Sequence, residues 1–345
     1  MRTFSCSCGN TLYFDNTLCI QCGKELGFNP VTGKTQVIEA NSPFRKCKNY
    51  HETDVCNWLV AQDDPHEFCL ACRLNEVIPD LSNHDNVQRW YKMEKAKRRL
   101  IYTLLKLRLP IVDKTADSDN GLSFRFMEDV KGIDPYTEEI VTYEKIMTGH
   151  NAGTITINIV EADDSMREEI REKMNESYRT ILGHFRHEIG HYYWNQLIAN
   201  SELIDEFRQL FGDEQKDYQS ALQRYYKDGP RDDWPDQYIS AYASAHPWED
   251  WAESWAHYLH FMDVLETASH HHVGLQGVEL TDEQSNVRRW LQSQKFSEVI
   301  LLLGQLMRIL NELNRSLGFP DPYPFEHSPN VVKKLEFIHR VVMAT

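Results

Sequence analysis

The chain has 345 residues, of which 41% are hydrophobic and 26% are charged, and its formal net charge is −15. These proportions are typical of a globular protein, and the acidic balance argues against broad affinity for nucleic acids or anionic membranes. No apolar run approaches the roughly 18 residues that a membrane span needs, and nothing between Met1 and Cys8 resembles a signal peptide. We therefore expect a cytoplasmic protein, and its length allows one small and one large domain or a large domain with two lobes.

The first predicted element is a metal-binding knuckle pair near the N-terminus. Gly9 and Gly23 each follow a pair of cysteines, at positions where a knuckle turn favours a residue that tolerates positive φ. The spacings Cys-x-Cys and Cys-x-x-Cys predict a zinc ion held by four thiolates. The predicted ligands of this first structural zinc are Cys6, Cys8, Cys19 and Cys22.

A second structural zinc is predicted within the same zinc-ribbon module, which we expect to end near Asn75. Its predicted ligands are Cys47, Cys56, Cys69 and Cys72. The first two of these are nine residues apart, so His51 or His66 could replace one of them. Disulfides are the alternative use of eight cysteines, but they do not suit a cytoplasmic protein. The module lacks a basic surface, so we expect it to bind a protein partner rather than nucleic acid.

A polar connector at residues 79–85 precedes a predicted helix at residues 87–109. This helix carries eight Lys or Arg residues and a single acidic residue, Glu94. Such a charge run is usually a solvated helix face, and the alternative is a dock for an acidic partner.

Strand patterns follow at residues 122–127 and 154–160. In the second, Ile155, Ile157 and Ile159 alternate with polar residues, as expected of a strand with one buried face. We expect the edge of this strand to accept an extended peptide as an additional strand.

A long helix is predicted next. Ser165 and Glu168 form a Ser-x-x-Glu capping box, and good helix formers continue to about Asn200 without a proline. Gly183 is a possible break between two helices.

The segment His187-Glu188-Ile189-Gly190-His191 lies inside this helix and matches H-E-x-x-H. Residues four apart on a helix point in similar directions, so His187 and His191 can hold one metal ion. Glu188 can then reach a metal-bound water as a general base. The pattern indicates a zinc hydrolase.

A catalytic zinc takes three protein ligands and leaves a position open for water. The metzincin pattern would require Gly at 194 and His at 197, where the chain has Trp194 and Leu197. A thiolate ligand is excluded as well, because no cysteine follows Cys72. The third ligand is therefore a downstream acid or histidine.

The segment 247–263 supplies candidates for this third ligand. At 100° per residue, one helix face is apolar and another gathers polar groups. The apolar face consists of Trp251, Ala252, Trp255, Tyr258, Leu259 and Met262. The polar face contains Glu249 and Glu253 together with His257 and His260, and we expect Glu249 to bind zinc while Glu253 orients a ligand histidine. A histidine ligand from His246, His257 or His260 remains the alternative.

The remainder of the chain is predicted to be mainly helical. Thr281-Asp282-Glu283-Gln284 is a second capping box, and breaks are expected near residues 228–230, 274–277 and 318–324. The side chains expected to be buried by the last long pattern are Ile300, Leu303, Met307, Leu310 and Leu313. His270, His271 and His272 fall in a predicted turn, where we expect an ordinary loop.

These motifs resemble those of the gluzincin metallopeptidases, and most closely the branch that contains anthrax lethal factor. The resemblance rests on H-E-x-x-H followed by the Glu-x-x-Ala-Glu helix at residues 249–253, and on Tyr242, seven residues before Glu249. It implies that Glu249 is the third ligand, that Glu253 supports the site, and that Tyr242 donates to the oxyanion.

The chain as a whole is similar to a bacterial family of zinc-binding metallo-peptidases with an N-terminal zinc ribbon. The matching blocks are the cysteine-rich start and residues 148–150, 153–158, 178–194 and 248–259. The resemblance implies an α+β protein with a double zinc ribbon at residues 1–75. A mostly helical, zincin-like metallopeptidase domain with a small β-sheet would then occupy residues 76–345, with its sheet and active-site helix before about residue 200.

The resulting hypothesis is a zinc endopeptidase that cleaves peptide or protein substrates with one catalytic and two structural zinc ions. Glu188 would take the proton of the water and pass it to the leaving amine. Two alternatives remain: a zincin with three histidine ligands, and a catalytically silent zincin module that recruits a protein partner. Because a purely structural zinc needs no base, Glu188 argues against the silent module.

Overall fold

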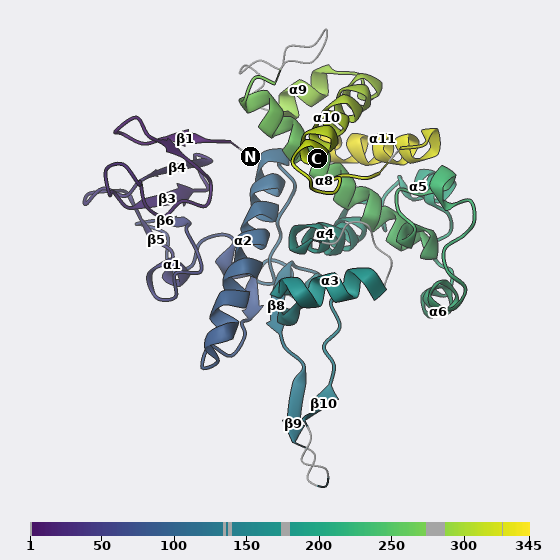
Figure 1. Ribbon diagram of the computed structural model, residues 1–345, viewed down its shortest axis with the longest axis horizontal. Helices are drawn as coiled ribbons and strands as arrows, with labels where there is room; N and C mark the ends of the chain where they lie inside the picture. Colours follow the sequence, from purple (N-terminus) through teal and green to yellow (C-terminus); the bar gives the residue numbers. More distant parts are fainter. Residues whose placement is uncertain (1, 134–135, 137–139, 174–179, 274–286, 326) are drawn as a thin grey trace. The chain divides into compact units, whose positions relative to one another are not determined.

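The computed structural model describes residues 2–133, 136, 140–173, 180–273, 287–325 and 327–345 (Figure 1). It is a mixed α+β protein, with small sheets in the N-terminal part and mostly helices after them. The chain divides into two compact units, one formed by residues 1–102 and 111–170 and the other by residues 103–110 and 171–345. None of the described helices is long and apolar enough to cross a membrane.

The first unit contains the N-terminal strands, one four-stranded sheet and a long helix. The strands are β1 Phe4–Ser5, β2 Thr11–Leu12, β3 Leu26–Asn29, β4 Lys34–Val37, β5 Phe44–Lys46, β6 Leu59–Ala61, β7 Asn75–Val77, β8 Ser123–Met127, β9 Val130–Ile133, β10 Ile140–Glu144, β11 Gly149–Asn151 and β12 Thr154–Asn158. The α-helices are α1 Lys48–His51, α2 His84–Leu107, whose end enters the second unit, and the start of α3 Asp164–Lys173.

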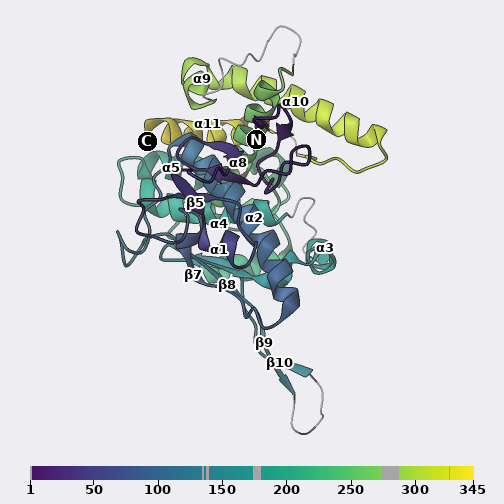
Figure 2. The same cartoon turned by 90° about the vertical axis from the view of Figure 1, so that its left-hand side faces the viewer.

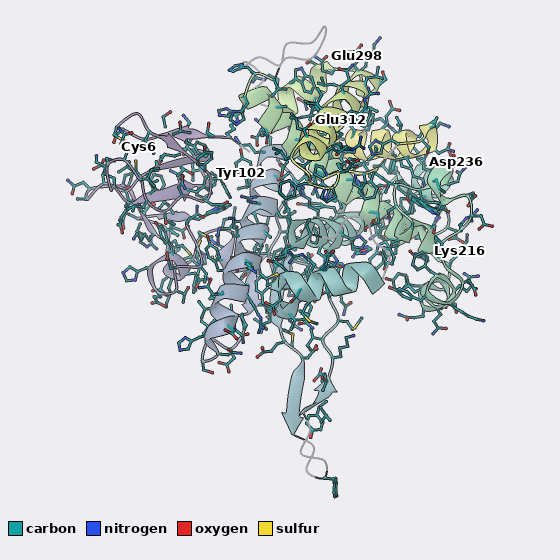
Figure 3. All side chains as sticks on the ribbon, viewed as in Figure 1. Cys6, Tyr102, Lys216, Asp236, Glu298 and Glu312 are labelled. Atoms are coloured by element: carbon teal, nitrogen blue, oxygen red, sulfur yellow. The ribbon has the colours of Figure 1, made fainter. Side chains whose placement is uncertain are left out.

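The ribbon part is built from two-stranded antiparallel hairpins that pair β1 with β2, β3 with β4 and β5 with β6. Hairpins this small cannot bury much apolar surface, so they depend on a shared cluster of aromatic rings. Phe28 is central to this cluster, with its ring centroid 4.8 Å from that of Phe14 and 4.9 Å from that of Trp58. Tyr102 of α2, labelled in Figure 3, packs edge-on against Phe14 at 5.2 Å. The aromatic cluster therefore joins the ribbon to α2.

Helix α2 differs from the predicted solvated helix. Lys97 and Arg98 are completely or almost completely buried, and so is Glu94. The ammonium of Lys97 lies 2.7 Å from a carboxylate oxygen of Glu94, and Arg98 donates to the backbone carbonyl of Val55. The prediction of a solvated basic face is wrong for these residues, because buried charges are tolerated where partners compensate them.

The sheet of the first unit has the strand order β11-β12-β8-β7. β12 runs parallel to β8 and antiparallel to β11, and Ile155 and Ile157 are buried as the alternation predicts. β12 therefore has neighbours on both sides, and the expectation that its edge accepts a peptide is wrong. The hairpin β9–β10 extends away from this sheet in both views (Figures 1 and 2).

The helical stretch predicted from Ser165 to about Asn200 is divided into two helices, as the possible break allowed, but at a different place. The structure has two helices, α3, which begins at Asp164 before the predicted cap, and α4 Ile181–Leu197. Gly183 is not the break, since its amide donates a 2.9 Å hydrogen bond to the side-chain oxygen of Thr180 and so caps α4.

The second unit contains the remaining helices. They are α4, α5 Ile204–Phe211, α6 Tyr218–Asp228, α7 Trp234–Gln237, α8 Pro247–His270, α9 Val287–Ser293, α10 Phe296–Ser316 and α11 Pro329–Ala344. α4 and α8 lie against each other, with Tyr193 stacked on Trp255 at 5.0 Å between ring centroids. Tyr258 and Phe261 of α8 are also buried, so α8 forms the core of this unit.

The buried face of α10 differs from the predicted one. Leu303 and Met307 are buried as predicted, but Leu310 and Leu313 are exposed. The buried side chains of α10 are Phe296, Val299, Leu302, Leu303, Leu306 and Met307. Periodicity alone allowed either stripe, because leucines occur on both sides of this helix. The predicted capping box at residues 281–284 and the break at residues 274–277 lie outside the described residues.

Candidate metal centre

Helix α4 carries the H-E-x-x-H segment in its middle. It begins after Thr180, whose side chain caps the first turn, and it contains no proline. His187 and His191 therefore lie one turn apart, and their ring centroids are 4.9 Å from each other. His191 is 3% exposed and Glu188 is 8% exposed, so the motif faces inward.

Helix α8 supplies the acidic residues. His246 is its N-cap, with Nδ1 accepting a 3.1 Å hydrogen bond from the amide of Trp248, and Pro247 occupies the first helical position. Glu249 and Asp250 fall in the first turn, where the helix dipole favours negative charge. Glu249 is 1% exposed.

Gly190 allows the two helices to approach each other. A Cβ atom built at this position would lie 3.0 Å from Cα of Ala252 and 3.2 Å from Cβ of Trp255. The carbonyl of Gly190 accepts a 2.9 Å hydrogen bond from the indole of Trp251. Glycine at the fourth position of the motif therefore sets the separation of α4 and α8, and with it the distance between the histidines and Glu249.

Three potential ligand atoms meet between these helices. Nε2 of His187 lies 3.0 Å from Oε2 of Glu249 and 3.2 Å from Nε2 of His191. Nε2 of His191 lies 3.6 Å from Oε1 of Glu249. One ligand atom from each of these side chains lies within 4.8 Å of the others, which suits a single ion.

Glu253 contacts the other ring nitrogen of His187. Its Oε1 lies 2.6 Å from Nδ1 of His187, and its Oε2 accepts a 2.6 Å hydrogen bond from the hydroxyl of Ser240. This arrangement favours the tautomer with the proton on Nδ1, which leaves Nε2 free to bind a metal.

Tyr242 and Glu188 border the same centre. Tyr242 begins the 3-10 helix Tyr242–Ala245, and its ring centroid lies 6.0 Å from that of His187. Burial raises the pKa of Tyr242 well above its ordinary value, and the charges of Glu249 and Glu188 add to this effect. Its phenol therefore keeps its proton at neutral pH and can donate a hydrogen bond.

The electrostatics of the centre favour a cation. Burial opposes the charged form of His187, yet Glu249 and Glu253 raise the pKa of this imidazole well above its ordinary value. The imidazoles of His191 and His187 likewise hold the pKa of Glu249 well below its usual range despite its burial. Oε2 of Glu249 is buried, and no described residue donates a hydrogen bond to it with good geometry. A divalent ion would satisfy this oxygen, so these residues fit a metal.

The histidines considered as alternative third ligands lie elsewhere. Nδ1 of His257 is 2.5 Å from the hydroxyl of Tyr323, and His260 contacts the guanidinium of Arg186. Nε2 of His246 lies 3.0 Å from the carbonyl oxygen of Lys216. Among the described residues, the group of ligand atoms at this centre contains Glu249 and none of these three histidines.

Two residues of the centre were not identified from the sequence. Tyr218 donates a 2.6 Å hydrogen bond to Oε1 of Glu249, and the ring of Trp248 lies 3.8 Å from that of His191 at 37°. Trp248 is adjacent to Glu249 in the sequence. A helix that starts at Pro247 would therefore have suggested that Trp248 lines the metal centre. Tyr218 is 31 residues from Glu249 and belongs to another helix, so no spacing rule could have identified it.

The eight cysteines form two groups in the first unit. Within each group, the sulfur atoms all lie within 4.8 Å of one another, and His51 and His66 belong to neither group. The first group is Cys6, Cys8, Cys19 and Cys22, of which Cys8 and Cys22 are exposed. The second is Cys47, Cys56, Cys69 and Cys72, all of them buried. Gly9 and Gly23 have φ of 88° and 70°, as expected for knuckle turns.

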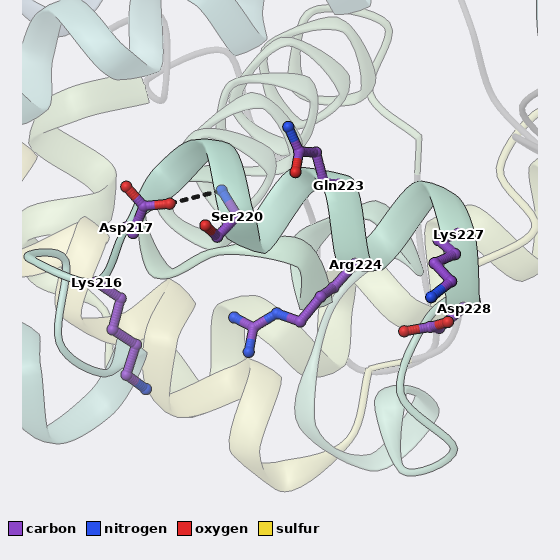
Figure 4. Close-up of a pocket in the computed structure, with 7 residues that line it drawn as sticks. All are labelled: Lys216, Asp217, Ser220, Gln223, Arg224, Lys227 and Asp228. Atoms are coloured by element: carbon purple, nitrogen blue, oxygen red, sulfur yellow. Dashed lines mark hydrogen bonds between the residues drawn. The ribbon is translucent and has the colours of Figure 1, made fainter.

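A separate hollow of about 590 Å³ lies on the outer face of α6 (Figure 4). Its lining residues are Lys216, Asp217, Ser220, Gln223, Arg224, Lys227 and Asp228. Tyr218 and Tyr225 point to the opposite side of this helix at 100° per residue, toward Glu249 and Tyr242 respectively. The hollow therefore does not belong to the metal centre.

The sequence is also similar to known protein families and to proteins of other organisms. The sequence profile of a family described as "Putative zinc-binding metallo-peptidase" matches residues 86–341, and a zinc-ribbon domain profile matches residues 3–83. Uncharacterised proteins of Mycobacterium tuberculosis and Mycobacterium bovis are 41% identical over 344 residues, which cover 99% of this chain and 95% of each relative. No solved structure matches the chain.

Proposed function

Because the chain belongs to this metallo-peptidase family and carries an N-terminal zinc-ribbon domain, we propose that it is a zinc-dependent endopeptidase with a gluzincin-type site. The proposed ligands are His187, His191 and Glu249. The observation that carries the proposal is the position of Glu249, whose buried Oε2 lies 3.0 Å from Nε2 of His187 and accepts no hydrogen bond of good geometry from any described residue. A catalytic zinc takes three protein ligands, and Glu249 would supply the third beside the two histidines.

Zinc bound by these residues would lower the pKa of a water molecule and polarise the carbonyl of the scissile peptide bond. Glu188 follows the first ligand on the buried face of α4, and as general base it would take the proton of the water and deliver it to the leaving amine. The protonated phenol of Tyr242 would donate a hydrogen bond to the oxygen on which negative charge develops.

Glu253 contributes through His187 rather than through the substrate. By accepting the Nδ1 proton, it holds the imidazole with Nε2 directed at Glu249 and His191. The pairing of His187 with Glu253 and the Tyr242 position also underlie the proposed similarity to the lethal factor branch.

The two cysteine groups are proposed as structural zinc sites, giving one catalytic and two structural ions. The backbone amide of Cys22 lowers the pKa of Cys19 to about 6, against the opposing effect of burial, and so favours the thiolate that binds zinc. We further propose that the module at residues 1–75 recruits a protein substrate or partner and that residues 76–345 form the peptidase domain.

The experiment compares the wild-type chain with Glu188→Gln. Both proteins are incubated with a bacterial proteome, and new peptide N-termini are identified by mass spectrometry. The wild type should produce N-termini that Glu188→Gln does not, while both proteins retain the same zinc content, because Glu188 is not a ligand. Glu202→Gln, an exposed substitution beyond the end of α4, serves as the matched control and should cleave like the wild type.

Equal N-terminal profiles for the wild type and Glu188→Gln, at full zinc occupancy, would refute the peptidase proposal. That result would favour the alternative, a zincin-like module that binds a protein partner without cleaving it.

A further inference from the structure

Tyr218 offers an inference that deepens the proposed function and rests on it. The two oxygens of the Glu249 carboxylate are in different environments. Oε1 accepts a 2.6 Å hydrogen bond from the phenol of Tyr218, whereas Oε2 lies 3.0 Å from Nε2 of His187 and accepts no hydrogen bond of good geometry from any described residue. A hydrogen bond on one oxygen fixes the rotation of a carboxylate and decides which oxygen is left for a cation.

We propose that Tyr218 is the positioning residue of the third metal ligand, holding Glu249 so that Oε2 is presented to the ion while Oε1 stays bound to the phenol.

The phenol is itself held in place by the start of α8. The Tyr218 ring packs edge-on against His246 and Trp248, with centroid distances of 5.3 Å and 5.8 Å. Nδ1 of His246 accepts from the amide of Trp248, so its proton is on Nε2 and donates to the carbonyl oxygen of Lys216 at 3.0 Å. These three contacts tie the start of α6 to the start of α8.

The beginning of α6 is also fixed within its own chain segment. Asp217 is the N-cap of α6 and accepts a 2.7 Å hydrogen bond from the amide of Ser220 (Figure 4). Since Tyr218 is the first residue of the helix, this cap fixes the direction of its side chain. An ordered phenol loses little conformational freedom when it binds Glu249, so the hydrogen bond can orient the carboxylate effectively.

This role separates Tyr218 from Tyr242. Tyr242 packs against a ligand imidazole and no hydrogen bond from it to Glu249 occurs in the described part of the chain, whereas Tyr218 bonds directly to the ligand carboxylate. Removing the Tyr218 hydroxyl should therefore weaken zinc binding, while removing the Tyr242 hydroxyl should lower turnover at unchanged zinc affinity. The Tyr218 arrangement parallels that of Glu253, which holds His187 in the same indirect manner.

The test is a zinc-buffered titration of the full-length chain. Occupancy of this centre is the zinc bound in excess of that bound by His191→Ala, which retains the cysteine sites. Tyr218→Phe should raise the zinc dissociation constant of this centre by about 10- to 100-fold, the usual effect of losing a hydrogen bond to a metal ligand. Tyr226→Phe changes a phenol that is 60% exposed on the same helix and should leave the constant unchanged.

A double-mutant cycle distinguishes the loss of the hydrogen bond to Glu249 from a disturbance of the fold by Tyr218→Phe. In a Glu249→Ala background, Tyr218→Phe should cause no further loss of zinc affinity, because the carboxylate that it orients is gone. An equal loss in both backgrounds would overturn the inference, and so would an unchanged dissociation constant in the single variant. Lower turnover at saturating zinc with unchanged affinity would reject it as well, because the phenol would then act on the substrate.

These outcomes are distinguishable from failure of the proposed function. A wild-type chain that binds zinc at this centre and loses affinity on Tyr218→Phe, but cleaves no peptide, would uphold the positioning role and reject the peptidase. Peptide cleavage that depends on Glu188, with zinc affinity insensitive to Tyr218→Phe, would uphold the peptidase and reject the positioning role.

Discussion

Replacing Gly190 with alanine tests whether the contact between α4 and α8 sets the geometry of the metal centre. The added methyl group would meet Cα of Ala252 at 3.0 Å, Cβ of Trp255 at 3.2 Å and the carbonyl oxygen of Ala252 at 3.3 Å. All three atoms belong to α8, and Ala252 and Trp255 are completely buried. Rotation of one side chain therefore cannot relieve this close contact. The two helices must instead move apart by a few tenths of an ångström.

Two opposing effects determine how much Gly190→Ala changes the free energy of unfolding. Overpacking of a buried contact typically costs about 1 to 3 kcal/mol. Alanine within a helix is more favourable than glycine by about 1 kcal/mol. The free energy of unfolding of Gly190→Ala should therefore fall by about 0 to 2 kcal/mol. Gly304→Ala in α10 is the matched control, because a Cβ there meets no atom within 4 Å, and it should gain up to about 1 kcal/mol.

The assay is urea unfolding of both variants beside the wild type, combined with zinc-buffered titration. The two variants should differ by about 1 to 3 kcal/mol, with Gly190→Ala the less stable. Only Gly190→Ala should lose zinc affinity, because His191 and Glu249 sit on the helices that it separates. If Gly190→Ala gained as much stability as Gly304→Ala and bound zinc normally, the close approach of α4 and α8 would not govern the site.

Three further predictions concern other parts of the chain. Glu253→Ala leaves the Nδ1 proton of His187 without its acceptor, so zinc affinity by chelator competition should fall by about 10- to 100-fold, and an unchanged affinity would contradict this role. A thiol-reactive mercurial should release zinc from the first cysteine group before the second, because Cys8 and Cys22 are exposed while the second group is buried. Zinc release is followed with a zinc-sensitive dye. A fast phase of release that remains in Cys8→Ser would exclude this order. Burial lowers the pKa of His339 to about 4, below the ordinary value near 6.5, so the unfolded chain binds more protons between these values and stability should decline as pH falls from about 6.5 to about 4. Urea unfolding at pH 7 and pH 5 measures that decline, which should be smaller in His339→Gln, and an identical decline would show that this histidine is not its source.

The sequence by itself determined the local chemistry of the chain. Residues three or four apart on one helix, or two or three apart in one knuckle, keep a fixed relation whatever surrounds them. For this reason His187 and His191 share a face of α4, and Gly9 and Gly23 adopt positive φ after their cysteine pairs.

Tertiary packing decided which faces meet. Either stripe of leucines on α10 had the correct period, and the packing partner selected the one that includes Leu303 and leaves Leu313 exposed. Charge composition predicted a solvated α2, but Glu94 and its neighbours compensate the buried Lys97 and Arg98.

The same limit applies to the metal centre. Glu249 could be predicted from a helical pattern and a family resemblance. Its contact with Tyr218 could not, because the two residues lie on different helices and no sequence periodicity relates them. A hydrogen bond between residues 31 positions apart depends on where α6 lies against α8, and that placement results from the sum of many packing contacts rather than from any local spacing.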